Sequence, residues 1–151
     1  MQGTTIALVR YIEGHSILGN QTISVSLIGF ATNLTVYRSG GNTPLFSIPW
    51  GNFQSVSYGV TYKRGLASVR STLMSILPVL ELTNASSAFH DGFTIDFWEE
   101  EIERNQHVFF AAASERKARN IVQEIYRHRD NYQRQSRAAS RPERREPPAS
   151  A

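Results

Sequence analysis

A group of four glutamates is the first feature of this sequence whose residue types could do chemistry. Glu99, Glu100, Glu101 and Glu103 are nearly consecutive. Carboxylates so placed can hold a divalent cation or work as a general acid and base. They stand beside Arg104, in a polar stretch between two apolar segments. We interpret them as the solvated end of a hairpin and predict no metal ligands.

The histidines do not form a recognisable site either. His15, His90, His107 and His128 are far apart, and no pair has the spacing of metal ligands. His90 and Asp91 follow serines, as parts of a hydrolase site would, but no nucleophile elbow accompanies them. The glycines match neither a dinucleotide-binding motif nor a phosphate-binding loop, and the chain has no cysteine. We therefore predict no catalytic residue, metal or cofactor.

Basic residues are the remaining candidates for a binding site. Residues 127–151 hold seven arginines and three acidic residues, a net charge of +4, which leaves −1 of the chain's +3 for residues 1–126. Lys63, Arg64 and Arg70 form a second, dispersed group. A basic tail can simply confer solubility. It can also hold anionic lipid, at about 1 kcal/mol per basic residue, or attract nucleic acid through the same charge.

Alternating apolar and polar residues predict β-strands in the first two thirds of the chain. The pattern covers residues 22–27, 33–38, 45–48 and 54–58. The second and third of these strands form a hairpin through the glycine-rich turn at residues 39–42. Pro49 ends the third, because proline cannot donate to a sheet ladder.

A second hairpin and a helix follow. Residues 93–98 and 107–113 alternate as two strands, with the turn expected near Arg104 and Asn105. Ser114 is a good helix N-cap. From there the period becomes helical to about residue 134. The apolar side is predicted to pack against Phe97 or Phe109, with Arg119 on the opposite side. That apolar side consists of Ala118, Ile121, Val122, Ile125 and Tyr132.

Two segments follow neither pattern. Residues 60–92 have no clear period, although residues 68–77 could form a short helix that Pro78 ends. We treat this segment as an irregular insertion. Residues 135–151 contain three prolines and no aromatic or β-branched residue. Such a segment buries too little apolar surface to offset its ordering entropy, so we predict a disordered, arginine-rich tail.

The order of these elements resembles the pleckstrin-homology superfold, in particular the bacterial pleckstrin-homology and GRAM-like domains. A segment common in those families, -IP-x-x-x-I-x-x-V-, is matched by Ile48, Pro49, Phe53 and Val56. The resemblance implies a mainly β fold for residues 1–134. The sheet is a curved antiparallel one, or a partly open barrel, of about six to seven strands capped by one C-terminal helix. The segments that carry it are NLTVYRSGG (33–41), PLFSIPWGNFQSVSYG (44–59), FTIDFW (93–98) and HVFFAAASERKARNIVQEI (107–125).

The resemblance also implies a non-catalytic interaction module. Members that bind phosphoinositides carry several Lys and Arg between their first two strands, and the corresponding loop, taken as residues 28–32, has none. We therefore expect a protein partner. It should bind at the insertion 60–92, at an exposed strand edge, or at both, because a free strand edge can accept a partner strand. The alternative is a peripheral membrane domain that binds anionic lipid through Lys63, Arg64 and the basic tail. Nucleic acid and small-molecule substrates are not expected. The candidate binding residues are Trp50, Lys63, Arg64 and Arg70.

Trp50 has two interpretations, core residue or exposed anchor, because it stands in a tight loop between Pro49 and Gly51. A cytoplasmic location is expected, with membrane association under the alternative. The apolar stretch at residues 6–9 is too short for a secretory signal.

The tail is predicted to be dispensable for folding. Truncation after Tyr132 should leave the thermal midpoint nearly unchanged, because only disordered chain is expected to be removed. Thermal melts of the full and truncated proteins measure this, and a large drop would mean that the tail packs on the domain.

Overall fold

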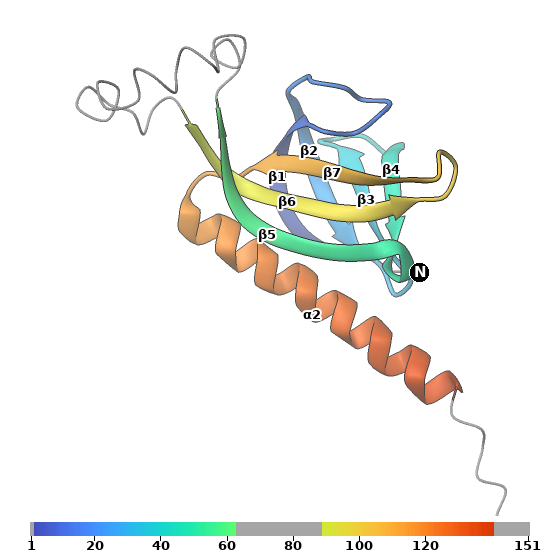
Figure 1. Ribbon diagram of the computed structural model, residues 1–151. Coiled ribbons are helices and arrows are strands. Elements are labelled where there is room, and N and C mark those ends of the chain that lie inside the picture. The colour runs from blue at the N-terminus through green and yellow to red at the C-terminus, as the bar shows by residue number, and fades with distance from the viewer. Residues whose placement is uncertain (1, 63–88, 141–151) are drawn as a thin grey trace, which may run out of the picture.

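The chain forms a seven-stranded antiparallel sheet and one long C-terminal helix (Figure 1). The computed structural model describes residues 2–62 and 89–140. The strands run in the order β4-β3-β2-β1-β7-β6-β5 across the sheet. This confirms the predicted mainly β fold with a helix packed on it. The elements are β1 (Thr4–Glu13), β2 (Ile23–Gly29), β3 (Asn33–Arg38), β4 (Pro44–Pro49), the short 3-10 helix η1 (Trp50–Asn52), β5 (Phe53–Tyr62), β6 (Phe89–Glu99), β7 (Arg104–Ala111) and α2 (Glu115–Ser140).

The sheet curls on itself, so strands that are not neighbours face each other across the core (Figure 1). Phe46 of β4 and Phe97 of β6 stack with their ring centroids 6.1 Å apart, although their strands lie at distant places in the sheet order. The alternation predicted for β2 is observed, since Ile23, Val25 and Leu27 are buried and the residues between them are not. One side of every strand therefore supplies the core that the curled sheet encloses.

Strand β1 was not predicted, yet it joins the two halves of the sheet by pairing with both β2 and β7. Its centre is apolar on both faces, which hides the alternation of a half-buried strand. Leu8 is 71% exposed, whereas Val9 and Tyr11 are buried. With β1 in place, residues 28–32 span the β2–β3 turn, and the loop between the first two strands is residues 14–22. That loop also contains no Lys or Arg.

Strands β5 and β6 reach into the segment predicted to be an irregular insertion. Gly59 follows the strand predicted over residues 54–58, but it pairs with Gly92 inside the ladder, and pairing continues to Tyr62 and Phe89. Gly92 marks a close approach of two strands, because a Cβ there would lie 2.0 Å from the backbone oxygen of Phe110. Residues 63–88 of the predicted insertion lie outside the described residues.

The turn between β6 and β7 lies a few residues earlier than predicted. Glu99 pairs with Arg104, so Arg104 and Asn105 already belong to β7. The turn occupies residues 100–103, where Glu103 has a left-handed φ of 49°. The four glutamates thus lie at a hairpin end, as interpreted from the sequence.

Helix α2 packs its predicted apolar side against β5, β6 and β1. Its N-terminus is capped as expected, since the backbone N–H of Lys117 donates to the Ser114 hydroxyl at 3.2 Å. Ala118, Ile121 and Ile125 are buried in the main core, and Val122 is partly buried against it.

Of the two aromatic residues expected near the apolar side of α2, Phe97 shares its core and Phe109 does not. Phe97 belongs to the same core cluster as Ile121 and Ile125. Phe109 does not, because it forms a separate cluster with Ile12 and Ala111. Strand alternation explains the difference, since the adjacent Phe110 is the β7 residue that enters the main core.

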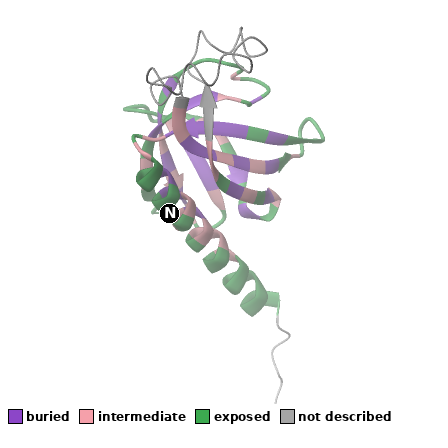
Figure 2. Ribbon diagram, turned by 60° about the vertical axis from the view of Figure 1, so that its left-hand side comes forward, coloured by how far each residue is buried: buried purple, intermediate pink, exposed green. Residues whose placement is uncertain are grey.

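The helix is longer than predicted and continues to Ser140 instead of ending near residue 134. Residues 133–140 are exposed on every side and project from the sheet (Figures 1 and 2). The first residues of the predicted disordered tail, 135–140, are therefore helical. They are rich in good helix formers, and no proline interrupts them before Pro142. Residues 141–151 lie outside the described residues.

Replacing Ile125 by Ala should destabilise the domain by about 2–5 kcal/mol, because the side chain is fully buried and its loss leaves a cavity. Gln123→Ala, on the exposed side of the helix, is the matched control and should change stability by less than about 0.5 kcal/mol. Arg119 is a poorer control than its predicted position suggested, since its guanidinium lies 4.4 Å from the centroid of the Tyr58 ring. Urea melts compare the variants, and equal small effects would show that α2 does not close a core.

Candidate binding surface

The outer edge of β5 is occupied by a tyrosine side chain from α2. Strand β5 ends the sheet formed by residues 2–62 and 89–140, so within these residues one of its edges has no neighbouring strand. At that edge the backbone N–H of Val56 donates to the Tyr126 hydroxyl at 3.2 Å, and the hydroxyl donates to the Val56 carbonyl at 2.8 Å. Both groups of Val56 thus point away from β6. In an antiparallel ladder this orientation recurs every second residue, so the backbone groups of Tyr58 point outward as well.

Two arginines of α2 lie over the aromatic rings along this edge. Arg129 has its guanidinium carbon 5.0 Å from the centroid of the Tyr126 ring and 5.6 Å from that of Phe53. Arg119 covers Tyr58 in the same way. These cation–π contacts hold the helix along the strand. We call this surface the β5–α2 edge, and its residues are Phe53, Val56, Tyr58, Arg119, Tyr126 and Arg129.

The Tyr58 hydroxyl anchors the far end of the edge. It donates to the Asp91 carboxylate at 2.9 Å, across the β5–β6 pair. This hydrogen bond to Asp91, more than any other contact, raises the pKa of Tyr58 above its usual value. The phenol therefore remains neutral near neutral pH, and its ring offers a π face to Arg119.

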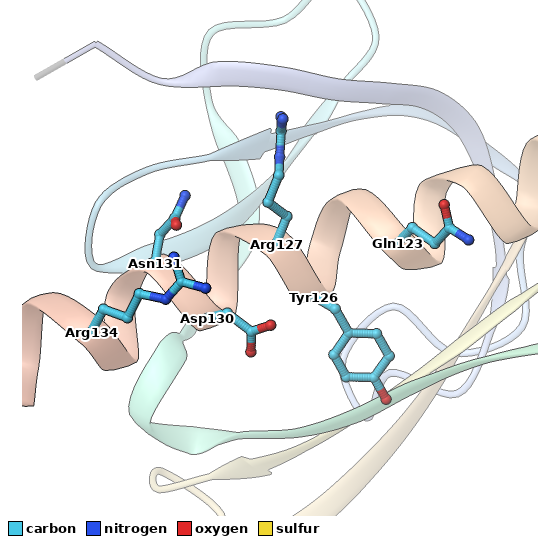
Figure 3. Close-up of a pocket in the computed structure, with 6 residues that line it drawn as sticks. All are labelled: Gln123, Tyr126, Arg127, Asp130, Asn131 and Arg134. Atoms are coloured by element: carbon cyan, nitrogen blue, oxygen red, sulfur yellow. The ribbon is translucent and has the colours of Figure 1, made fainter.

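The exposed side of α2 adds an open, polar hollow next to this edge (Figure 3). It has a volume of about 490 Å³, and its described lining comes from α2 alone. Tyr126 belongs to both the hollow and the β5–α2 edge, and its ring points from the helix toward β5 (Figure 3). The hollow therefore extends the edge surface with charged and amide groups. Its lining residues are Gln123, Tyr126, Arg127, Asp130, Asn131 and Arg134.

The arginines near the edge are paired with acids of the same helix. Arg119 contacts Glu115 at 3.0 Å, and Arg127 contacts Glu124 at 2.6 Å. Exposed pairs of this kind contribute only about 0–1 kcal/mol. A carboxylate of a partner could therefore replace Glu115 or Glu124 in these ion pairs at little cost in free energy.

The structure does not bring the four sequence-predicted binding residues together. Trp50 is only 2% exposed, and its indole N–H donates to the Phe30 carbonyl at 2.9 Å. It is a core residue that a partner cannot reach in this conformation. Lys63, Arg64 and Arg70 lie outside the described residues.

The sequence led us to expect an exposed strand edge as a binding surface, but not that β5 and α2 form it. Tyr126 follows the buried Ile125 on the helix, and that neighbourhood was the only signal for it. Its partner Val56 lies 70 residues away in the chain. No local pattern joins two residues at that separation, so their contact appears only in the folded structure.

One group of polar residues has the types of a catalytic triad without its arrangement. Asp96 accepts a hydrogen bond from Ser55 at 3.0 Å and also bonds His107. A serine nucleophile needs its base hydrogen-bonded to the hydroxyl, and here the carboxylate lies between the two. This arrangement therefore does not activate Ser55. Among the described residues, no three histidine or acidic side chains gather as a metal site.

The comparisons with known proteins do not place the chain in a family. Its comparison with protein-family models gives no match, and comparisons with curated proteins and with solved structures give none either. Within the described part of the chain, no helix is both long and apolar enough to cross a membrane.

Tyr126→Phe should destabilise the domain by about 1–2 kcal/mol. It keeps the ring but removes the hydroxyl that accepts from the Val56 N–H and donates to the Val56 carbonyl. Tyr37→Phe removes a hydroxyl from β3, far from β5 in the sheet order, and is the matched control. Urea melts of both variants measure the difference. Equal effects would show that the Tyr126 hydroxyl does not stabilise the edge.

Proposed function

We propose that this chain is a non-catalytic, pleckstrin-homology-like interaction module that binds a protein partner along the β5–α2 edge. The curled antiparallel sheet with a helix packed on it supports the pleckstrin-homology-like assignment. The observation that carries the binding proposal is the pair of hydrogen bonds between Val56 and Tyr126. These bonds support the proposal because the outward backbone groups of Val56 are satisfied by one side chain, and no strand of the described residues pairs with them.

A partner segment would bind by adding a strand to β5. Main-chain hydrogen bonds provide affinity in this mode, while side chains at alternate positions provide specificity. The partner backbone would replace the Tyr126 hydroxyl at Val56, two bonds for two. It would gain further bonds at the outward groups of Tyr58, so the exchange is favourable overall.

The charges near the edge favour an acidic partner. Arg119 and Arg129 lie directly over the aromatic rings of the edge. Arg127 and Arg134 line the adjoining hollow. A carboxylate at every second position of an added strand would meet these guanidinium groups, which form strong charge-assisted hydrogen bonds with carboxylates.

The other free edge, that of β4, is less suited to strand addition. Pro44 and Pro49 stand at the two ends of β4. Proline has no backbone N–H, and prolines on edge strands protect against pairing. Strand β5 has ten residues, and the described structure contains no proline within it.

A peptide selection tests the proposal. A displayed library of random peptides is selected on the purified domain, and backbone amide shifts locate the bound peptide. We expect extended, acidic peptides that shift the amides of Val56 and Tyr58. Tyr126→Phe should bind them about tenfold more tightly, because the competing hydroxyl, worth about 1–2 kcal/mol, is gone.

Tyr37→Phe is the binding control and should leave affinity unchanged. Peptides that shift amides away from β5, or no enrichment at all, would contradict the proposal. Sedimentation with vesicles of phosphatidylserine and phosphatidylcholine tests the membrane alternative. Salt-sensitive binding that survives deletion of residues 135–151 but not the change of Lys63 and Arg64 to Ala would replace the protein partner by a membrane.

A further inference from the structure

The imidazole of His128 is enclosed where α2 meets the corner of the sheet. Its ring stacks on Trp50 of η1, with centroids 6.4 Å apart and an angle of 10° between the planes. Its Nδ1 side lies against Gly29 at the end of β2, where an added Cβ would come within 2.8 Å of that nitrogen. Its Nε2 atom is shielded from solvent and has no hydrogen-bond partner in the described structure.

His128 also lies at the boundary between the attached and the projecting parts of α2. Up to Tyr126 the helix is held by the buried Ile121 and Ile125 and by the Tyr126 hydrogen bonds. Beyond that point, His128, Arg129 and Tyr132 are partly buried, and residues 133–140 are exposed. The contacts of His128 and Tyr132, together with the contact of Arg129 with the Phe53 ring, therefore decide whether the last attached turns stay on the sheet.

A positive charge on this imidazole would be poorly accommodated. Burial lowers the pKa of His128 below its usual value, the adjacent Arg127 lowers it further, and Glu124 on the same helix acts in the opposite direction. The described residues that line the space beside it from other elements carry no charge. They are Gln2, Thr4, Gly29, Phe30 and Ala31.

A protonated imidazole at this buried position would lose the water that hydrates a cation, and stacking on Trp50 does not compensate for that loss. An aromatic ring stabilises a cation that lies within about 6 Å of its centroid. The imidazole centroid lies 6.4 Å from that of Trp50. Protonation would also make both ring nitrogens donors, and within the described residues none accepts a hydrogen bond from Nε2, so that atom would be an unsatisfied buried donor, which is costly.

We propose that His128 is a pH-sensitive latch, whose protonation releases α2 from His128 onward while the helix up to Tyr126 stays packed. The released form leaves the histidine in water and exposes Trp50. Because the attached form has the lower pKa, the released form binds more protons. The attachment is complete above the usual histidine value of about 6.5, weakens as the pH falls below it, and levels off below the lowered pKa.

Trp50 can report the release in a Trp98→Phe background, which removes the other, partly exposed tryptophan. As the pH falls from about 7.5 to about 5, across the histidine range, we expect the emission maximum to move to longer wavelength. Access of acrylamide to the indole should increase over the same range. Both readouts measure exposure to solvent, so quenching of intensity by a nearby imidazolium does not imitate them.

The control is His128→Phe in the same background, which retains an aromatic ring against Trp50 and cannot be protonated. It should show no shift in this pH range. His128→Gln, also uncharged, serves the same purpose if the first variant folds poorly. His15 is present in all of the variants compared, so any effect of its own titration is the same in each and cancels. An equal shift in the control, or no shift with His128 present, would overturn the proposal. Loss of the far-ultraviolet circular dichroism of the whole domain over the same range would overturn it too.

Discussion

The burial of one side of α2 against a curled sheet is the interaction on which the rest of this structure depends. A seven-stranded sheet that ends in β4 and β5 does not close its own core. Ala118, Ile121 and Ile125 supply the missing apolar cover from a single helix. Burying these side chains fixes the rotation of α2 about its axis, so it also fixes where every other residue of the helix points.

The β5–α2 edge is a consequence of that fixed rotation. Tyr126 directly follows the buried Ile125, and successive residues of a helix are turned by about 100°. With Ile125 in the core, the Tyr126 ring is directed sideways onto β5, where it meets the Val56 backbone. An edge strand with free backbone groups invites uncontrolled pairing. The same helix that closes the core therefore also covers the strand edge, and under the proposed function a partner strand would replace its contact with Val56.

Much of the fold could be predicted from the sequence, because the hairpins and α2 each carry a local period. Strand β1 was not predicted because Leu8 faces outward while Val9 and Tyr11 face inward. Apolar residues therefore occupy both of its faces, and no alternation is visible in the sequence. Gly59 looked like a strand end because glycine usually weakens a strand, whereas here it pairs with Gly92. An exposed strand edge could be expected from the sequence, but its identity as the β5–α2 edge could not, since the contact between Val56 and Tyr126 joins two residues that no local period connects.

Tyr126 and His128 act on opposite sides of the same helix. They are two residues apart, which turns their side chains by about 200° around the axis. Tyr126 contacts β5, whereas His128 contacts η1 and the end of β2. Ile125 lies between these directions and faces the core. Loss of the His128 contacts therefore leaves Ile125 and Tyr126 in place. A change of protonation would act on the projecting end of α2 and would also move Arg129 away from the Phe53 ring, whereas the contact of Tyr126 with Val56 would remain.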